Sequence, residues 1–286
     1  MAVDAEQQLR AYVEYFRDLG IHDFYRRGEP VAIEAAEVIA AVSSASPQPP
    51  PIVLEPAPVL VAASAPHHPQ EGVIPKPFSF NDLAPVPQVR VAVSARPGAL
   101  QAIRDEIGDC TRCPLAYAGR RNIVFGEGDA SARLMFVGEG PGADEDASGR
   151  PFVGKAGQLL NNMIAAMGLQ REEVYIANIV KCRPPANRVP EPVEANTCAQ
   201  FLVKQIDVVQ PEVVVALGST AATYLLGVKQ SLASLRGHWH SCRGAKLAVT
   251  YHPAFLLRDP RQKGEAWKDL QRVMAEMGLK PPARKS

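Results

Sequence analysis

A short stretch of the chain places acidic side chains among glycines, between an apolar run and an amphipathic pattern. Four carboxylates lie within residues 138–154: Glu139, Asp144, Glu145 and Asp146. Carboxylates at this density can stabilise developing positive charge or orient a water molecule. Glycines permit tight backbone bends, so the loop can bring these groups close to a ligand. The stretch therefore predicts an active-site loop.

Two nucleotide-binding patterns overlap this stretch, and both match it poorly. Residues 138–142 approach a dinucleotide-binding glycine loop, but Glu139 and Pro141 oppose a pyrophosphate, which needs backbone N–H donors. Residues 149–156 approach a P-loop, but Ala156 stands where a Ser or Thr hydroxyl would hold magnesium. A nucleotide-dependent enzyme is the weaker alternative.

Four of the five cysteines have a spacing that favours a metal site. Cys110 and Cys113 form a Cys-x-x-Cys pair, and Cys182 and Cys198 follow separately. Thiolates select zinc or an iron–sulfur cluster, and structural zinc sites usually bring two compact pairs. The wide separation of the last two cysteines favours a four-iron cluster with a structural role. The alternative is that some are ordinary buried thiols, which is the role we expect for Cys242.

The elements that must position these groups alternate along the chain. Apolar runs predict strands at 134–137, 174–180, 213–217 and 247–251, and amphipathic patterns predict helices at 154–167, 192–208 and 219–226. This alternation predicts a three-layer α/β/α fold with a central parallel four-stranded sheet. Ligands bind at the carboxyl ends of the strands in such sheets. The acidic loop follows the first predicted strand, so it lies at that edge.

The first hundred residues differ in composition from the rest. Half of the 26 prolines lie between Pro47 and Pro97, which predicts an extended, Pro/Ala-rich linker at 43–97. A helical N-terminal segment at 1–42 precedes the linker, and a catalytic domain at 98–280 follows it. A helix as short as the one predicted at 4–19 is marginal alone, so it either binds a protein partner or folds against the main domain.

Charge and hydropathy restrict the classes of function. The net charge of +1 combines 7 Lys/Arg against 11 Asp/Glu in residues 1–100 with 24 against 19 in the remainder. A mildly basic domain is compatible with a nucleic-acid partner. No apolar run reaches the length of a membrane span, and no signal peptide is recognisable. We expect a cytoplasmic monomer without a membrane partner, in which the cysteines do not form structural disulfides.

Taken together, the motifs resemble the family 4, iron–sulfur uracil-DNA glycosylases. The resemblance covers about residues 110–279 and rests on the segments 138–154, 178–188 and 252–258, with four cysteines in the family's order. It implies a uracil-DNA glycosylase fold and an enzyme of base excision repair. Such an enzyme flips uracil out of single- or double-stranded DNA and hydrolyses its N-glycosidic bond, leaving an abasic site. It also implies a 4Fe–4S cluster held by Cys110, Cys113, Cys182 and Cys198.

The resemblance also implies roles for single residues around the base. The substrate-binding residues are Gly140, Phe152, Asn178 and Asn187. Phe152 stacks on the flipped ring, and the Asn178 amide, which is both donor and acceptor, pairs with the uracil edge. Glu139 and Glu145 offset charge on the sugar and orient water, while His252 donates to uracil O2.

The remaining implied contacts are with DNA. They are Ser219, Arg183, Arg188, Leu256 and Arg258. Ser219 begins a predicted helix, where backbone N–H groups favour phosphate. The run 255–257 is similar to the wedge that fills the space left by the flipped nucleotide, with either Phe255 or Leu257 inserting. A non-catalytic iron–sulfur DNA-binding or scaffold protein is the second hypothesis, and the intact set of catalytic residues argues against it.

Overall fold

The computed structural model describes residues 79–280. The chain divides into two units, 1–68 and 69–286, and only the second contains described residues, so it is treated by itself. The predicted helical segment at 1–42, its partner and the first part of the predicted linker lie outside the described residues and stay predictions. Within 79–280, no helix has both the length and the apolar character needed to cross a membrane.

A six-stranded sheet forms the centre of the domain. Its strands are β1 (Glu127–Gly128), β2 (Leu134–Gly138), β3 (Tyr175–Asn178), β4 (Val213–Leu217), β5 (His240–Cys242) and β6 (Ala245–Thr250), in the order β1-β3-β2-β4-β6-β5. The four inner strands are parallel, whereas β1 and β5 are antiparallel edges. The predicted parallel sheet is therefore confirmed for the four inner strands. The prediction missed the two edge strands, so the observed sheet is wider than expected. The edge strands are too short to show a periodicity of two in the sequence.

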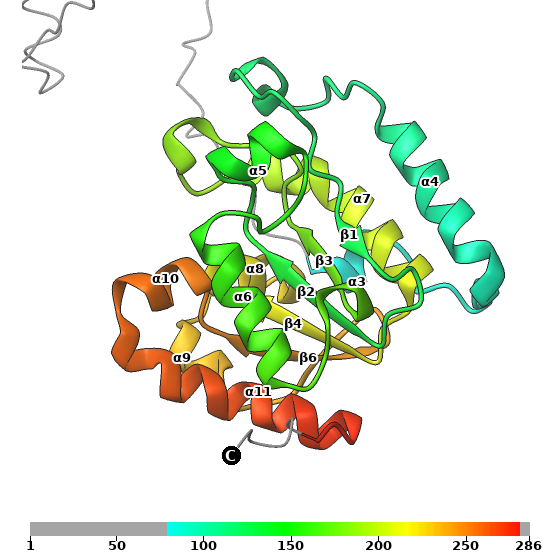
Figure 1. The fold of residues 1–286 in the computed structure, drawn as a ribbon. Helices are drawn as coiled ribbons and strands as arrows, with labels where there is room; N and C mark the ends of the chain where they lie inside the picture. The colour runs from blue at the N-terminus through cyan, green and yellow to red at the C-terminus, as the bar shows by residue number, and fades with distance from the viewer. Residues whose placement is uncertain (1–78, 281–286) are drawn as a thin grey trace, which may run out of the picture. The chain divides into compact units, whose positions relative to one another are not determined.

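Helices cover both faces of the sheet (Figure 1). One face carries α6 (Lys155–Ala166), α10 (Pro253–Arg258) and α11 (Lys263–Met277), and the other carries α3 (Phe80–Leu83), α4 (Arg96–Ile107), α7 (Pro192–Val209) and α8 (Ser219–Leu226). Along β2, Leu134 and Phe136 pack in one apolar cluster, while Met135 and Val137 pack in the other. Side chains alternate across a strand, so both faces are buried, as a parallel sheet requires.

The remaining elements are short. They are the helices α5 (Ala143–Ser148) and α9 (Leu232–Leu235) and the 3-10 turns η1 (Val93–Ala95), η2 (Pro114–Tyr117), η3 (Arg171–Glu173), η4 (Pro185–Asn187) and η5 (Pro260–Gln262). The predicted helices agree with α6, α7 and α8 to within about one residue. The predicted strand 174–180 is shorter, because the chain leaves the sheet after Asn178.

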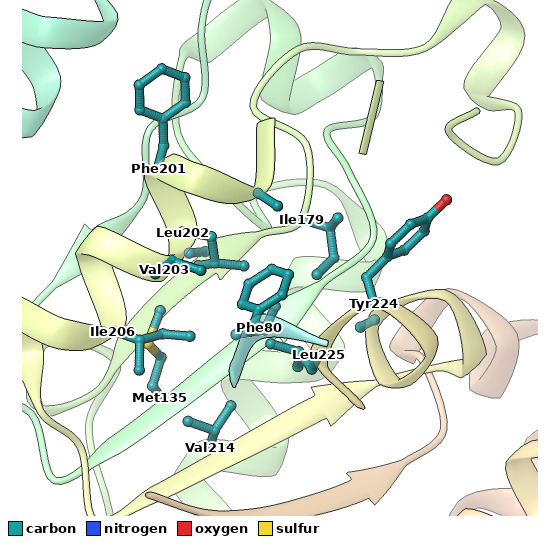
Figure 2. Packing of buried hydrophobic residues seen from close by; sticks show 14 of the residues in the cluster. Phe80, Met135, Ile179, Phe201, Leu202, Val203, Ile206, Val214, Tyr224 and Leu225 are labelled. Carbon is teal, nitrogen blue, oxygen red and sulfur yellow. The ribbon is translucent and has the colours of Figure 1, made fainter. Parts of the chain in front are cut away.

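The last part of the predicted linker belongs to the folded domain. Phe80 is fully buried in the apolar cluster that also holds Leu202 and Ile206 of α7 and Leu225 of α8 (Figure 2). The guanidinium of Arg243, itself buried, donates to the carbonyls of Phe80 (3.0 Å) and Pro85 (2.9 Å). The packed chain thus begins by residue 79, and the predicted boundary at 98 is wrong. Proline-rich composition did not reveal that single aromatic anchor.

Candidate active site

A pocket of about 630 Å³ opens where the four parallel strands end. Glu139 follows β2, Asn178 ends β3, Ser219 follows β4, and His252 follows β6. Ten of the predicted base, catalytic and DNA residues line it: Glu139, Gly140, Glu145, Phe152, Asn178, Asn187, Arg188, Ser219, His252 and Arg258. In the sheet, β3 lies on one side of β2 and β4 on the other, so the strand order reverses at β2. Ligands of open α/β sheets bind at such a reversal.

Asn178 presents an unpaired acceptor at this edge of the sheet. Its side chain is 1% exposed, and its Oδ1 is the one buried side-chain polar atom in the described part of the chain that lacks a hydrogen-bond partner. Leaving such an acceptor unsatisfied costs about 1–3 kcal/mol. A Cβ on Gly138 would lie 2.5 Å from this oxygen, so only glycine fits there. The arrangement favours a ligand that donates a hydrogen bond.

Phe152 is held in a rare backbone conformation beside Asn178. Its φ of 51° lies in the left-handed region, which costs a non-glycine residue on the order of 1–3 kcal/mol. Arg171 donates to the carbonyls of Phe152 (3.2 Å) and Pro151 (2.5 Å) and so fixes this turn. A Cβ on Gly157 would lie 1.9 Å from the Phe152 carbonyl oxygen. The phenyl ring thereby lines the pocket, and its centroid lies 5.6 Å from the centroid of the His252 ring.

The two predicted catalytic carboxylates have different surroundings. Glu145 accepts backbone N–H bonds from Gly142 (3.0 Å), Val153 (2.9 Å) and Gly154 (3.1 Å). Its carboxylate therefore fastens the two ends of the acidic loop together. Glu139 lines the same pocket, and among residues 79–280 no group hydrogen-bonds its carboxylate. Glu139 is consequently the carboxylate that is available to a ligand.

The other two acidic residues of the loop lie outside the pocket lining. Asp146 is 3% exposed, and its Oδ1 accepts from the backbone N–H groups of Arg121 (2.9 Å) and Asn122 (3.3 Å). Asp144 is exposed. Of the four acidic residues, Glu139 thus offers a carboxylate to the pocket, Glu145 and Asp146 accept backbone N–H bonds, and Asp144 is exposed.

His252 is neutral and has one ring N–H to offer. The Ala254 N–H donates to its Nδ1 (3.1 Å), so the ring proton is on Nε2. Burial, assisted by the nearby Arg258, lowers the pKa of His252 from 6.5 to about 4, while Glu145 opposes the shift. An uncharged imidazole is therefore present at neutral pH. It can donate a hydrogen bond to a developing anion without first losing a proton.

The predicted DNA contacts fall into two groups. Ser219, at the N-terminus of α8, and Arg258, at the end of α10, are exposed and line the pocket. Arg188 is paired with Glu194 through two bonds of 2.7 and 2.8 Å. Arg183 lies outside the pocket lining and donates to Asn187 Oδ1 (2.8 Å). The last two arginines thus hold the loop between β3 and α7.

Leu256, which was predicted to contact DNA, lies inside the fold. Leu256 is 1% exposed and packs in the apolar cluster formed with α6 and α11. Leu257, the next residue of α10, is 42% exposed. Phe255 is partly buried and stacks on Tyr251, with ring centroids 5.2 Å apart. Leu257 is therefore the more exposed of the two wedge candidates, whereas Phe255 is the one that lines the pocket.

The four predicted cysteine ligands line one small cavity, away from Cys242 in β5. Three of their sulfurs accept hydrogen bonds: Cys110 from Arg112 (3.3 Å), Cys182 from Arg120 (3.4 Å) and Cys198 from the Lys181 backbone N–H (3.3 Å). Such bonds to sulfur are a feature of iron–sulfur sites. Across the part of the chain that the structure describes, no three His, Cys, Asp or Glu side chains form a group that could hold a metal ion by geometry alone.

Burial opposes ionisation of three of these cysteines. It raises the pKa of Cys198 to about 12 and also raises the pKa values of Cys113 and Cys182. Metals bind the thiolate, so a bound cation has to displace these protons. The donor groups Arg112, Arg120 and Lys181 were missed by the sequence analysis. Arg112 and Lys181 each precede a cysteine directly in the chain, whereas Arg120 has no cysteine beside it and gave no local signal.

Comparisons with known proteins agree with this geometry. The family model of the uracil DNA glycosylase superfamily matches residues 125–271, which defines the class of the domain. A type-4 uracil-DNA glycosylase of Thermotoga maritima is 46% identical over 162 residues, covering 56% of this chain and 84% of that protein. Those of Pyrobaculum aerophilum and Archaeoglobus fulgidus are 42% and 38% identical, covering 60% and 64% of this chain and 91% and 96% of theirs. The chain belongs to the type-4 uracil-DNA glycosylases, and the resemblance inferred from the motifs is confirmed.

Proposed function

We propose that this protein repairs deaminated cytosine by removing uracil from DNA and leaving an abasic site. The observation that carries the proposal is the buried Oδ1 of Asn178 at the end of β3, which has no hydrogen-bond partner among residues 79–280. Uracil in DNA offers an N3–H donor beside its O4 acceptor, and an amide side chain can pair with both. Cytosine presents an acceptor and an amino group in the same places, so it is mismatched.

The pocket suits a base that has left the helix. A glycosylase must extrude its target and hold it by stacking and by hydrogen bonds to its edge. Phe152 supplies an aromatic face near Asn178, and the left-handed turn that presents it is held by Arg171. Gly140 and Asn187 line the same space, as base-site residues should.

Charge develops in two places when the N-glycosidic bond breaks. The sugar becomes positive, and its charge is opposed by the carboxylate of Glu139 in the pocket, which also orients the attacking water. The departing uracil becomes negative at O2, where His252 donates its Nε2–H. Glu145 acts indirectly, because its oxygens accept N–H bonds from the loop that carries Phe152.

DNA is held at the mouth of the pocket. The backbone N–H groups at the start of α8, with Ser219, form a natural phosphate site. Arg258 adds positive charge, and the exposed Leu257 beside it fills the space left by the flipped nucleotide. Arg183 and Arg188 contribute by positioning the β3–α7 loop, with electrostatic attraction to the DNA backbone.

The four cysteines hold a 4Fe–4S cluster. Cys110 and Cys113 lie between α4 and η2, Cys182 follows β3, and Cys198 lies on α7. When bound, the cluster supplies iron–thiolate bonds that tie these segments together. The thiolate donor set and the N–H groups directed at three of the sulfurs support this assignment.

Uracil release from a defined oligonucleotide tests the proposal. Purified protein is incubated with a strand that contains one uracil, and alkali then cleaves any abasic site. We expect a break at the uracil position and none in the matching cytosine strand. Asn178→Ala is the control, and it should slow the break to a low residual rate while retaining the iron. DNA binding without any break would instead favour the non-catalytic scaffold.

A further inference from the structure

A buried lysine lies between the two cavities. Lys181 is 1% exposed, and its Nζ donates to the main-chain carbonyl of Asn178 (3.0 Å) and to Gln205 Oε1 (2.6 Å). Its backbone N–H donates to the Cys198 sulfur, and the residue lines the cysteine cavity. One residue is therefore bonded to the end of β3 on one side and to a cysteine ligand on the other.

The acceptor on α7 is itself fixed. Gln205 is fully buried, and its Nε2 donates to the Phe125 carbonyl (3.0 Å) and to the Tyr175 hydroxyl (3.1 Å). Within residues 79–280, no carboxylate forms an ion pair with Lys181. Burying a cation without a counter-charge is costly, so a nearby negative charge is needed to hold it. The cysteine cavity that Lys181 lines supplies this negative charge when its four cysteines bind a metal as thiolates.

We propose that Lys181 couples the four-cysteine site to uracil recognition. Its ammonium fixes the carbonyl of Asn178 and so aims the Asn178 amide. The negative charge of the ligated cysteine site in turn keeps the ammonium in place. Lys181 is thus a positioning residue that acts through Asn178, and the inference rests on the proposed function.

The first test replaces the ammonium and keeps the aliphatic chain. Lys181→Met loses a charged donor to the Asn178 carbonyl, so single-turnover uracil release should fall about tenfold or more. Binding to DNA that already contains an abasic site should stay unchanged, because no base is recognised there. Lys204→Met is the matched control, since Lys204 lies on α7 and pairs at the surface with Glu106. It should release uracil at the wild-type rate.

A double-mutant cycle separates positioning from general damage. If Lys181 acts through the Asn178 side chain, Lys181→Met should change the residual rate less than about twofold in the Asn178→Ala background. A general folding defect would lower the rate by the same factor in both backgrounds. Such full additivity would overturn the proposal. If Lys181→Met is insoluble, Gln205→Met is combined with Asn178→Ala in the same cycle. It removes one acceptor of the ammonium, so we expect a smaller loss of single-turnover rate.

Cluster lifetime tests the other end of the coupling and needs no substrate. The visible absorbance of the cluster is followed without DNA while a chelator and an oxidant are present. Lys181→Met should lose it several-fold faster than wild type, because it removes a positive charge that interacts with Cys198 while it keeps the backbone N–H bond to that sulfur. Equal lifetimes would contradict the coupling. If wild type releases no uracil, the proposed function fails, while this measurement still reports on Lys181.

Discussion

The strand-end pocket and the cysteine cavity treat their polar atoms in opposite ways. In the strand-end pocket, Asn178 Oδ1 and the Glu139 carboxylate have no hydrogen-bond partner among the described residues. In the cysteine cavity, three of four sulfurs accept N–H bonds, from Arg112, Arg120 and Lys181. A site for a transient ligand keeps its polar atoms free for that ligand. A site for a resident group surrounds the group with fixed donors.

Burial also has opposite consequences in the two cavities. It favours the neutral form of every ionisable group, which lowers the pKa of His252 to about 4 and raises the pKa of Cys198 to about 12. In the pocket the neutral imidazole is the useful form, because it donates to an anion. In the cysteine cavity the neutral thiol cannot ligate iron, so assembly of the site must displace protons.

The largest expected effect lies in the cysteine cavity. Cys198→Ser removes a thiolate from the resident group, so we expect iron content to fall to near background and solubility to drop. Cys242→Ala is the matched control, because Cys242 is buried in β5 outside that cavity. It should retain its iron. Iron and sulfide per chain are measured on anaerobically purified protein. Zinc without iron in the wild type would contradict the assignment of an iron–sulfur cluster to the four cysteines.

Changes in the pocket should reduce chemistry and leave the fold intact. His252→Ala removes the donor to the leaving base, and one such donor is worth on the order of a hundredfold in rate. Single-turnover cleavage of a uracil strand measures the loss. Iron content and binding to abasic-site DNA should match the wild type. A wild-type cleavage rate for this variant would show that His252 does not stabilise the leaving base.

The two carboxylates sharpen the comparison within the pocket itself. Glu139→Gln removes a charge that has no protein partner among the described residues, so we expect slower cleavage, by about tenfold or more, at an unchanged melting temperature. Glu145→Gln replaces an acceptor of three backbone N–H bonds with a weaker one. It should lower the melting temperature by several degrees, corresponding to about 1–2 kcal/mol. If Glu139→Gln instead lowered the melting temperature and Glu145→Gln slowed cleavage, Glu145 would be the catalytic carboxylate and Glu139 the structural one.

The smallest expected effect is a pH dependence. An ordinary histidine has a pKa of 6.5, but the pKa of His252 is about 4. The imidazole therefore stays neutral, and its contribution to the single-turnover rate should not decline between pH 7 and pH 5. Between these two pKa values the unfolded chain binds the extra proton, so the contribution of His252 to stability falls as pH drops from 6.5 to about 4. A rate inflection near pH 6.5 that vanished in His252→Gln would contradict this assignment.

Periodicity predicted the parts of the molecule that are long and buried. The inner strands and α6, α7 and α8 appear where the apolar patterns place them, and their loops meet at one sheet edge as parallel topology requires. Most predicted site residues therefore line one pocket. The short edge strands β1 and β5 carry too few residues to show a pattern, and Phe80 is a single anchor inside a proline-rich stretch.

Contacts between distant segments account for what the sequence left open. Glu139 and Glu145 look equivalent in the chain, and only the folded loop brings three N–H groups to Glu145. Leu256 and Leu257 differ in exposure because α10 packs on α6 with one face only, and neighbouring helix residues lie on different faces. Lys181 bonds to Gln205, 24 positions away, which no local pattern reveals.

The central claim is that the unpaired Oδ1 of Asn178 accepts the N3–H of uracil. It is tested most directly by comparing matched strands that contain uracil or N3-methyluracil, in single-turnover cleavage by the unmodified enzyme. The methyl group removes the donor and faces a buried acceptor, so cleavage should fall by a factor on the order of a thousand or more. Release of N3-methyluracil at the uracil rate would contradict the account.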